Sequence, residues 1–240
     1  MTDTGTKTPR ERYRAQVRAE IKERAWEQIA TAGASALSLN AIAKLMGMSG
    51  PALYRYFAGR DELITELIRD AYRSLADAFH AAVASGADVT GLAHVLREWA
   101  LADPHRYLLI YGTPVPGYHA PDDITAISSE IMGMLLDACG ELPPAAPAAP
   151  AAPAAPAAPA APAAPAAPAA EFDGHLADHR GWAGAHPAPD VILHRALTFW
   201  TRLHGVLSLE LAGHFTGMTF DPALLFTAEL TDLVRPRPAR

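Results

Sequence analysis

Residues Ser38–Phe57 read SLNAIAKLMGMSGPALYRYF, and this stretch decides the fold of the chain. Ser38 is a good N-cap for a helix, and the apolar residues after it recur at helical spacing. Gly47 readily adopts the left-handed conformation that ends a helix. Ser49 can cap a second helix, in whose first turn Pro51 is tolerated. The sequence therefore predicts two short helices joined by a tight, glycine-containing turn, which is a helix-turn-helix.

An ordinary helical hairpin with a glycine corner is the alternative interpretation of this stretch. It would account for the caps and the apolar stripe, but not for Tyr54, Arg55 and Tyr56 on a short exposed helix. The second helix of a helix-turn-helix enters the DNA major groove, where such side chains reach phosphates and base edges. We therefore expect DNA binding, although either tyrosine could instead pack against the helix expected at residues 10–31.

The charge is distributed unevenly along the chain. Residues 1–60 hold ten lysines and arginines against five acidic residues, a net charge of +5. The other 180 residues hold ten basic and 21 acidic residues, a net charge of −11, which together give the overall −6. Positive charge is thus concentrated around the helix-turn-helix, as neutralisation of DNA phosphates requires.

Composition excludes several classes of protein. Cys139 is the only cysteine, so an intrachain disulfide and a thiolate zinc site are excluded, and a small buried apolar role is favoured over redox sensing. No apolar run is long enough to cross a bilayer, and no membrane partner is expected. The N-terminal MTDTGTKTPRERYR lacks the apolar middle of a secretory signal. A cytoplasmic protein without a cofactor is expected.

Helical periodicity occurs along the whole chain, and strand-like alternation does not. We therefore expect an all-α fold of about nine helices. These span residues 10–31, 39–46, 50–57, 60–85, 89–102, 107–111, 121–138, 190–214 and 221–234. The expected organisation is a disordered tail (1–9), a three-helix DNA-binding domain (10–58), and a larger helical domain (59–235), whose regulatory and dimerisation roles are what the family resemblance given below implies.

A low-complexity tract interrupts the second domain at residues 143–170. Proline recurs at every third residue from Pro144 to Pro168, with alanine between. Proline fixes φ and removes the amide donor, which favours polyproline II over helix or sheet. A docking site for an aromatic groove is the alternative, but no flanking basic residue is present. We expect a semi-rigid linker, followed by an irregular segment over 171–189.

The last two expected helices, 190–214 and 221–234, are apolar on several sides. A helix of this kind must be covered on several sides, which favours a contribution from a second protomer. Two such helices meeting their symmetry copies would form a two-fold, four-helix interface. The candidate interface residues form a near-heptad stripe: Leu193, Leu197, Trp200, His204, Leu207 and Leu211.

The helix-turn-helix resembles that of the tetracycline-repressor (TetR) family of one-component regulators. The matching residues are Gly47, Ser49, Leu53-Tyr54, Tyr56-Phe57 and Asp61-Glu62-Leu63. The resemblance implies a dimer that binds a palindromic operator in double-stranded DNA. Ser38, Asn40, Lys44 and Arg60 would then contact the DNA backbone. The reading residues would be Ser49, Gly50, Pro51, Ala52, Tyr54, Arg55 and Tyr56, with Arg55 the best candidate for reading a guanine.

The C-terminal part resembles the WHG-type TetR C-terminal domain. The resemblance rests on Trp200, His204 and Gly205, and on Pro104-His105-Arg106-Tyr107 with Tyr111-Gly112-Thr113-Pro114. It implies a pocket for a small apolar or aromatic effector, although the candidate residues could simply be core. These are Phe79, Leu96, Trp99, Tyr107, Tyr111, Ile127, Ile131, Met134 and Leu135. The resemblance also implies that effector binding shifts the long helix at 60–85 and releases DNA.

Two other functions are weighed against a regulator. The pair His175 and His179 has helical i, i+4 spacing, but it lies beside the linker, and no metal site is expected. No G-x-S-x-G, P-loop, dinucleotide-binding or H-E-x-x-H motif is present, so an enzyme is not expected. An architectural DNA-binding protein without an effector remains open, but the acidic body argues against it.

Overall fold

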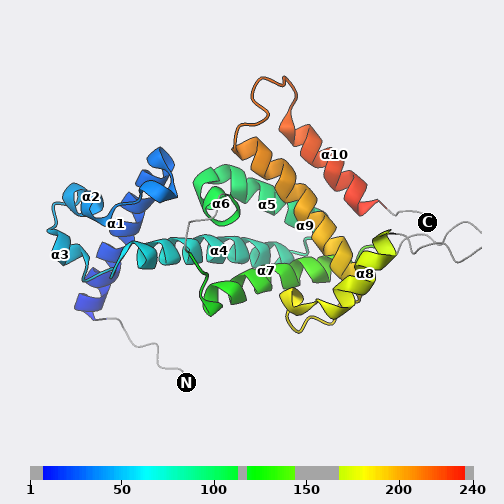
Figure 1. Ribbon diagram of the computed structural model, residues 1–240, viewed down its shortest axis with the longest axis horizontal. Coiled ribbons are helices and arrows are strands. Elements are labelled where there is room, and N and C mark those ends of the chain that lie inside the picture. Colours follow the sequence, from blue (N-terminus) through cyan, green and yellow to red (C-terminus); the bar gives the residue numbers. More distant parts are fainter. Residues whose placement is uncertain (1–7, 113–117, 144–167, 236–240) are drawn as a thin grey trace, which may run out of the picture. The chain divides into compact units, whose positions relative to one another are not determined.

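The computed structural model describes residues 8–112, 118–143 and 168–235. Every regular element within these ranges is helical (Figure 1). The described residues form two compact units. Unit 1 comprises the residues up to Ser74 together with Asp103–Thr125. Unit 2 comprises Leu75–Ala102 and the described residues from Ala126 onward. The prediction of an all-α fold is confirmed.

Helix α1 (Pro9–Ala32) opens unit 1 and carries its first apolar stripe. Thr8 begins it with a capping box, in which its hydroxyl and the Glu11 carboxylate each accept an N–H at the helix start. The stripe consists of Val17, Ile21, Ala25 and Ile29, which are all buried. Gly33, at φ 79°, ends the helix and precedes the 3-10 turn η1 (Ala34–Ala36).

The helix-turn-helix consists of α2 (Leu39–Leu45) and α3 (Gly50–Leu53). The Ser38 side chain accepts the Ala41 N–H as an N-cap, and Gly47 has φ 64°, as predicted. The prediction of a second helix through Phe57 is wrong, because α3 ends at Leu53. The amide of Tyr56 donates to the Leu53 carbonyl at 2.8 Å, a tighter i to i−3 turn that carries Phe57 into the core. We call Ser49–Phe57 the reading segment.

The core of unit 1 joins the reading segment to the helices around it. Leu53 and Phe57 are fully buried against α1 and against the first part of α4 (Arg60–Ala84). Leu109 of α6 (Pro104–Tyr111) and Ile124, at the start of α7 (Asp122–Gly140), belong to the same core. The unit that contains the helix-turn-helix therefore extends well beyond residue 58.

Unit 2 contains the second part of α4, α5 (Val89–Ala102), most of α7, α8 (Pro168–Asp178), the 3-10 turn η2 (Gly181–Ala183), α9 (Asp190–Leu211) and α10 (Pro222–Val234). Figure 1 shows α9 and α10 side by side as an antiparallel pair, and α8 and α5 also contact α9. Asp221 caps α10 by accepting the Ala223 N–H at 2.8 Å. No helix in the described part of the chain has the length and hydropathy to cross a membrane.

Helix α8 corrects the prediction of a linker to residue 170 followed by an irregular segment. The helix starts with Pro168 at a position where proline is tolerated, and residues 144–167 of the tract lie outside the described residues. Leu176 is buried, and Asp173 pairs with His194 of α9 at 2.6 Å. These contacts with α9 stabilise a helix that local propensity alone, with Gly174 in its middle, does not predict.

Arg195 of α9 holds the end of α7. Its guanidinium donates to the carbonyl of Cys139 at 3.0 Å and to those of Leu142 and Pro143 at 3.3 Å each. Carbonyls at the end of a helix have no partner within the helix, so an arginine from a neighbouring helix can satisfy them. Cys139 itself is buried, and burial raises the pKa of its thiol to about 12. This position suits a structural cysteine and not a reactive one.

Candidate DNA-binding interface

The predicted DNA contacts form a connected surface on α2 and the reading segment. Asn40, Lys44, Ser49, Pro51, Tyr54 and Arg55 are exposed, whereas Ser38, Gly50, Ala52, Tyr56 and Arg60 are partly covered. Within the described residues, neither Lys44 nor Arg55 forms an ion pair with another side chain, so both side chains are available to contact DNA. This distribution is compatible with the predicted DNA-binding roles of the exposed residues.

The two helices meet closely at Gly50. A Cβ atom added there would lie 3.5 Å from Oδ1 of Asn40, which is ordinary van der Waals contact. The space beside Asn40 therefore does not require a glycine at position 50, and an alanine would fit there. The Ser49 side chain makes no capping hydrogen bond to α3, so its hydroxyl is not committed to the helix it precedes.

Tyr54 and Tyr56, which the sequence treats alike, have different surroundings. Tyr54 is 47% exposed, whereas Tyr56 packs against the core of unit 1. The guanidinium of Arg14 lies 5.9 Å from the centre of the Tyr56 ring. Tyr54 is thus the more accessible of the two tyrosines, and the Tyr56 ring has a packing role.

Arg60, predicted as a backbone clamp, is engaged within the chain. Its Nη2 donates to the carbonyl of Ala34 at 2.9 Å, and at 3.4 Å to that of Ser35. These bonds tie the start of α4 to η1. Arg60 would have to leave both carbonyls to contact a phosphate with that nitrogen, so its first role here is to hold the helices of unit 1 together.

Two arginines of α1 support the reading segment, and sequence analysis did not single them out. Arg14 donates to the carbonyl of Arg55 at 3.2 Å, and Arg18 donates to that of Tyr56. Arg18 also lies over the ring of Phe57, 4.1 Å from its centre. The signal that could have identified them is the i, i+4 spacing of Arg14, Arg18 and Lys22, which places three cations on one side of α1.

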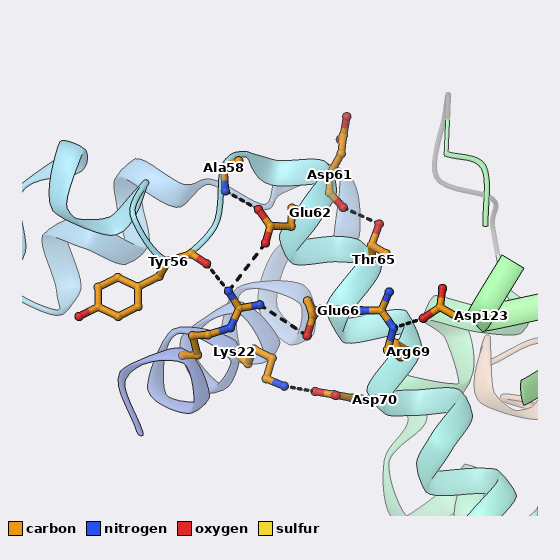
Figure 2. Close-up of polar contacts among 11 residues, drawn as sticks. Lys22, Tyr56, Ala58, Asp61, Glu62, Thr65, Glu66, Arg69, Asp70 and Asp123 are labelled. Carbon is orange, nitrogen blue, oxygen red and sulfur yellow. Dashed lines mark hydrogen bonds and ion pairs between the residues drawn. The ribbon is translucent and has the colours of Figure 1, made fainter. Parts of the chain in front are cut away.

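An ion-pair network continues from Arg18 along α4 (Figure 2). The Arg18 guanidinium lies 3.7 Å from the Glu62 carboxylate and 3.6 Å from that of Glu66. Glu66 also bonds Arg69, which in turn bonds Asp123 of α7 at 2.6 Å. A parallel pair joins Lys22 to Asp70 at 2.5 Å. The network links α1, the reading segment, α4 and the first turn of α7.

The candidate effector-pocket residues are divided between the two units. Tyr107 and Tyr111 belong to unit 1, and the other seven belong to unit 2. All nine are buried or half-buried.

In unit 1 the Tyr111 ring contacts those of Tyr107 and Tyr72, with centroids 5.3 and 6.0 Å away. Burial raises the pKa of the Tyr111 hydroxyl well above its ordinary value, so this hydroxyl is neutral. Tyr72 was missed, although it lies three residues before Leu75 on the inner face of α4.

The candidate dimer-interface stripe on α9 is largely internal to the chain. Leu193 and Leu207 are fully buried and His204 is 9% exposed, whereas Leu197, Trp200 and Leu211 are half-buried. The prediction is therefore wrong for Leu193 and Leu207, which have no surface left for a partner. The reason is that α8, α5 and α10 cover these sides of α9 within one protomer. The large apolar residues exposed on this helix pair are Val191, Leu209 and Leu224.

The histidines near the linker stack on one another. The rings of His175 and His179 lie 4.0 Å apart at an interplanar angle of 14°, and a ring nitrogen of His179 contacts the His175 carbonyl at 3.0 Å. In the ranges that the structure describes, no group of three or more histidine, cysteine or acidic residues is arranged to hold a metal ion.

A helix-turn-helix with an exposed cationic face, joined to a larger helical part, defines a DNA-binding transcriptional regulator. The chain belongs to the TetR family. Residues 21–67 match the family described as bacterial regulatory proteins of the tetR family, and residues 89–233 match the tetracyclin repressor-like C-terminal domain. The function is thus transcription regulation through DNA binding, a non-enzymatic class.

Known regulatory proteins are similar to this chain along almost its full length. The HTH-type transcriptional regulator Rv1816 of Mycobacterium tuberculosis is 35% identical over 229 residues, which cover 92% of each chain. The solved regulatory protein SCO4313 is 66% identical, covers 95% of this chain and 99% of that one, and has a TM-score of 0.79. The fatty acid degradation regulator FadR from Bacillus halodurans is 14% identical, with a TM-score of 0.52, and shares the fold.

Proposed function

We propose that the protein is a homodimeric repressor that binds a palindromic operator and is released by a small apolar or aromatic effector. The observation that carries the DNA-binding half of this proposal is the exposed face of Asn40, Lys44, Tyr54 and Arg55. Lys44 would supply sequence-independent affinity for phosphates, and Arg55 would read a base edge in the major groove. Two such faces in a dimer would enter successive major grooves, about 34–36 Å apart.

The effector half of the proposal is supported by the chemistry of the candidate pocket residues. They are aromatic or aliphatic, and buried tyrosine hydroxyls such as that of Tyr111 are neutral donors or acceptors. Residues of this kind, within either unit, would favour an uncharged apolar or aromatic molecule with at most a few polar groups. An effector could release DNA only by binding the DNA-free conformation more tightly, and a coupling of about 2 kcal/mol would weaken operator binding about thirtyfold.

The dimer is supported by the apolar surface that remains on α9 and α10. Leu209 and Leu224 are both exposed, and Leu224 is 70% exposed. A contiguous exposed apolar patch is typical of a surface that meets another protein, and Leu209 and Leu224 lie on two helices that pack together. The pair of helices, and not the Leu193–Leu207 stripe, would then form the two-fold contact.

The test starts with selection of the operator. Wild-type protein is used to enrich binding sites from a library of random duplex DNA, and the enriched sequence is checked for inverted repeats. A mobility-shift assay on that duplex is then repeated with a panel of uncharged aromatic and aliphatic compounds and a matched panel of charged ones. We expect release by a member of the first panel.

Two outcomes would contradict the proposal. Enrichment of no sequence, or of a single half-site, would exclude a dimer on a palindrome. A selected operator that no compound of either panel releases would favour the architectural alternative, in which DNA binding is independent of an effector. Transcription from the operator in a reconstituted system separates repression from activation.

A further inference from the structure

The reading segment contains a very short helix, and the turn after that helix is held by side chains from α1. Helix α3 has only four residues, and the chain then turns through Tyr54–Tyr56. Carbonyls in a turn that does not continue as a helix have no helical partner and need others. Here two arginines of α1 supply them: Arg14 for the carbonyl of Arg55, and Arg18 for that of Tyr56. The conformation of the segment therefore depends on side chains from another helix.

Of these two arginines, Arg18 makes more contacts than Arg14. Its guanidinium bonds the carbonyl of Tyr56, covers the ring of Phe57, and lies within 4 Å of two carboxylates of α4, Glu62 at 3.7 Å and Glu66 at 3.6 Å. Glu62 itself accepts the Ala58 N–H at 2.5 Å, just after the reading segment. Because a guanidinium has donors in a fixed planar arrangement, a change at either carboxylate alters how Arg18 meets the Tyr56 carbonyl.

The carboxylate of Glu66 is shared, and this extends the chain of contacts to α7. Arg69 bonds Glu66 on one side and Asp123 at 2.6 Å on the other, as Figure 2 shows. The hydrogen bond from Arg69 lowers the pKa of the Asp123 carboxyl, so Asp123 is charged at neutral pH. Four side chains thus connect the first turn of α7 to the backbone of the reading segment: Asp123, Arg69, Glu66 and Arg18.

We propose that Arg18 is a positioning residue for DNA reading, and that Asp123 sets how firmly it holds the Tyr56 carbonyl, through Arg69 and Glu66. Loss of the Asp123 charge leaves Arg69 with Glu66 as its acidic partner. Arg69 then draws that carboxylate away from Arg18, and the reading segment loses part of its support. A displacement of the first turn of α7 has the same effect. The consequence for operator recognition rests on the proposed function, but the coupling itself does not.

The first test measures the coupling without DNA. Hydrogen exchange of the amides at residues 53–58 is compared in wild type, Asp123→Asn and the matched control Asp122→Asn, which removes a neighbouring carboxylate from the same first turn. We expect faster exchange in Asp123→Asn and no change in Asp122→Asn. In an Arg18→Gln background, Asp123→Asn should add no further acceleration. Because Arg18→Gln could disturb the packing on Phe57, Arg18→Lys serves as the milder second background.

Unchanged exchange in Asp123→Asn, or equal acceleration with and without Arg18, would overturn the proposal.

The second test measures the ratio of affinities for the selected operator and for random duplex DNA. Asp123→Asn should lower this ratio at least about twofold in wild type and leave it unchanged in the Arg18→Lys background. An unchanged ratio in wild type would overturn the role in DNA reading. If no operator is enriched, the proposed function fails, and the exchange measurement still decides the coupling.

Discussion

Arg97 of α5 and Glu210 of α9, 113 residues apart in the chain, form a bidentate ion pair. Nη1 of Arg97 lies 2.5 Å from one carboxylate oxygen of Glu210, and Nη2 lies 2.9 Å from the other. Both side chains are largely buried, with exposures of 12% and 16%. The guanidinium also lies 5.1 Å from the centre of the Phe226 ring of α10. One arginine thus joins three helices of unit 2.

Removing one member of this pair should cost more than removing both. Arg97→Met leaves the Glu210 carboxylate buried without its partner, and we expect a loss of about 3–5 kcal/mol in the free energy of unfolding. Arg97→Met/Glu210→Met should lose less than the single variant, because no unpaired charge remains. Urea unfolding at one protein concentration measures both. Arg24→Met, which breaks the exposed pair with Glu27 on α1, is the control and should have little effect. A double variant less stable than the single one would contradict this account.

Burial of His204 should make stability depend on pH. Desolvation lowers the pKa of its imidazole to about 3, whereas an unfolded histidine has an ordinary value near 6.5. The unfolded state therefore binds the proton more readily, and stability should fall as pH decreases from 6.5 towards 3, by about 1.4 kcal/mol per pH unit. Between pH 6.5 and 5 the expected loss from this group is about 2 kcal/mol.

Two variants separate this contribution from that of the carboxylates. His204→Gln removes the titrating group, so its free energy of unfolding should vary less between pH 6.5 and 5 than that of wild type. His214→Gln replaces an exposed histidine ten residues later and should keep the wild-type slope. Equal slopes in all three proteins would show that His204 does not titrate as its burial predicts.

Arg55 should carry base discrimination. Arg55→Ala is expected to weaken binding to the selected operator by about 1–3 kcal/mol relative to random DNA, because a bidentate contact to a guanine is lost. Lys44→Ala should instead weaken both by similar factors and reduce the salt dependence, as loss of a phosphate contact does. Fluorescence anisotropy on the two duplexes at several salt concentrations measures both effects. Unchanged discrimination in Arg55→Ala would remove this residue from the reading set.

The exposed apolar surface of α10 should be needed for the dimer. Leu224→Arg places a charge where two copies would meet, and sedimentation equilibrium at micromolar concentration should then show a monomer. Val83→Arg, at an exposed residue near the end of α4, is the matched control and should leave the assembly unchanged. A wild-type protein that already sediments as a single chain would refute the proposed dimer directly.

Most of the Pro/Ala tract should be dispensable, whereas α8 should not. Excision of residues 147–167 removes the repeat up to the start of α8 and should leave the melting temperature and the DNA affinity nearly unchanged. Leu176→Ala should destabilise the protein by about 2–5 kcal/mol, because it opens a cavity at a buried contact of α8. Loss of folding on excision of 147–167 would show that the repeat itself has a structural role.

Sequence analysis predicted helix boundaries correctly where the capping residues, glycines and apolar spacing agreed. Helix α5 occupies the predicted residues Val89–Ala102, and Ser38 and Gly47 delimit α2 as expected. Caps, glycines with positive φ and apolar spacing act over a few residues, so they can be recognised without the fold. The concentration of positive charge around the helix-turn-helix comes from the same kind of reasoning, whereas only the structure separates the exposed Tyr54 from the half-buried Tyr56.

The features that sequence did not predict depend on contacts between distant residues. Helix α8 is stabilised by α9, and α3 ends early because Phe57 enters the core of unit 1. The α9 stripe through Leu193 and Leu207 has the spacing of an interface, but its burial was decided by which helices of the same chain cover it. Helical periodicity identifies an apolar face and does not identify what covers that face. The same limit applies to Arg18, whose place between the Tyr56 carbonyl and the acidic residues of α4 exists only once α1 and α4 are packed together.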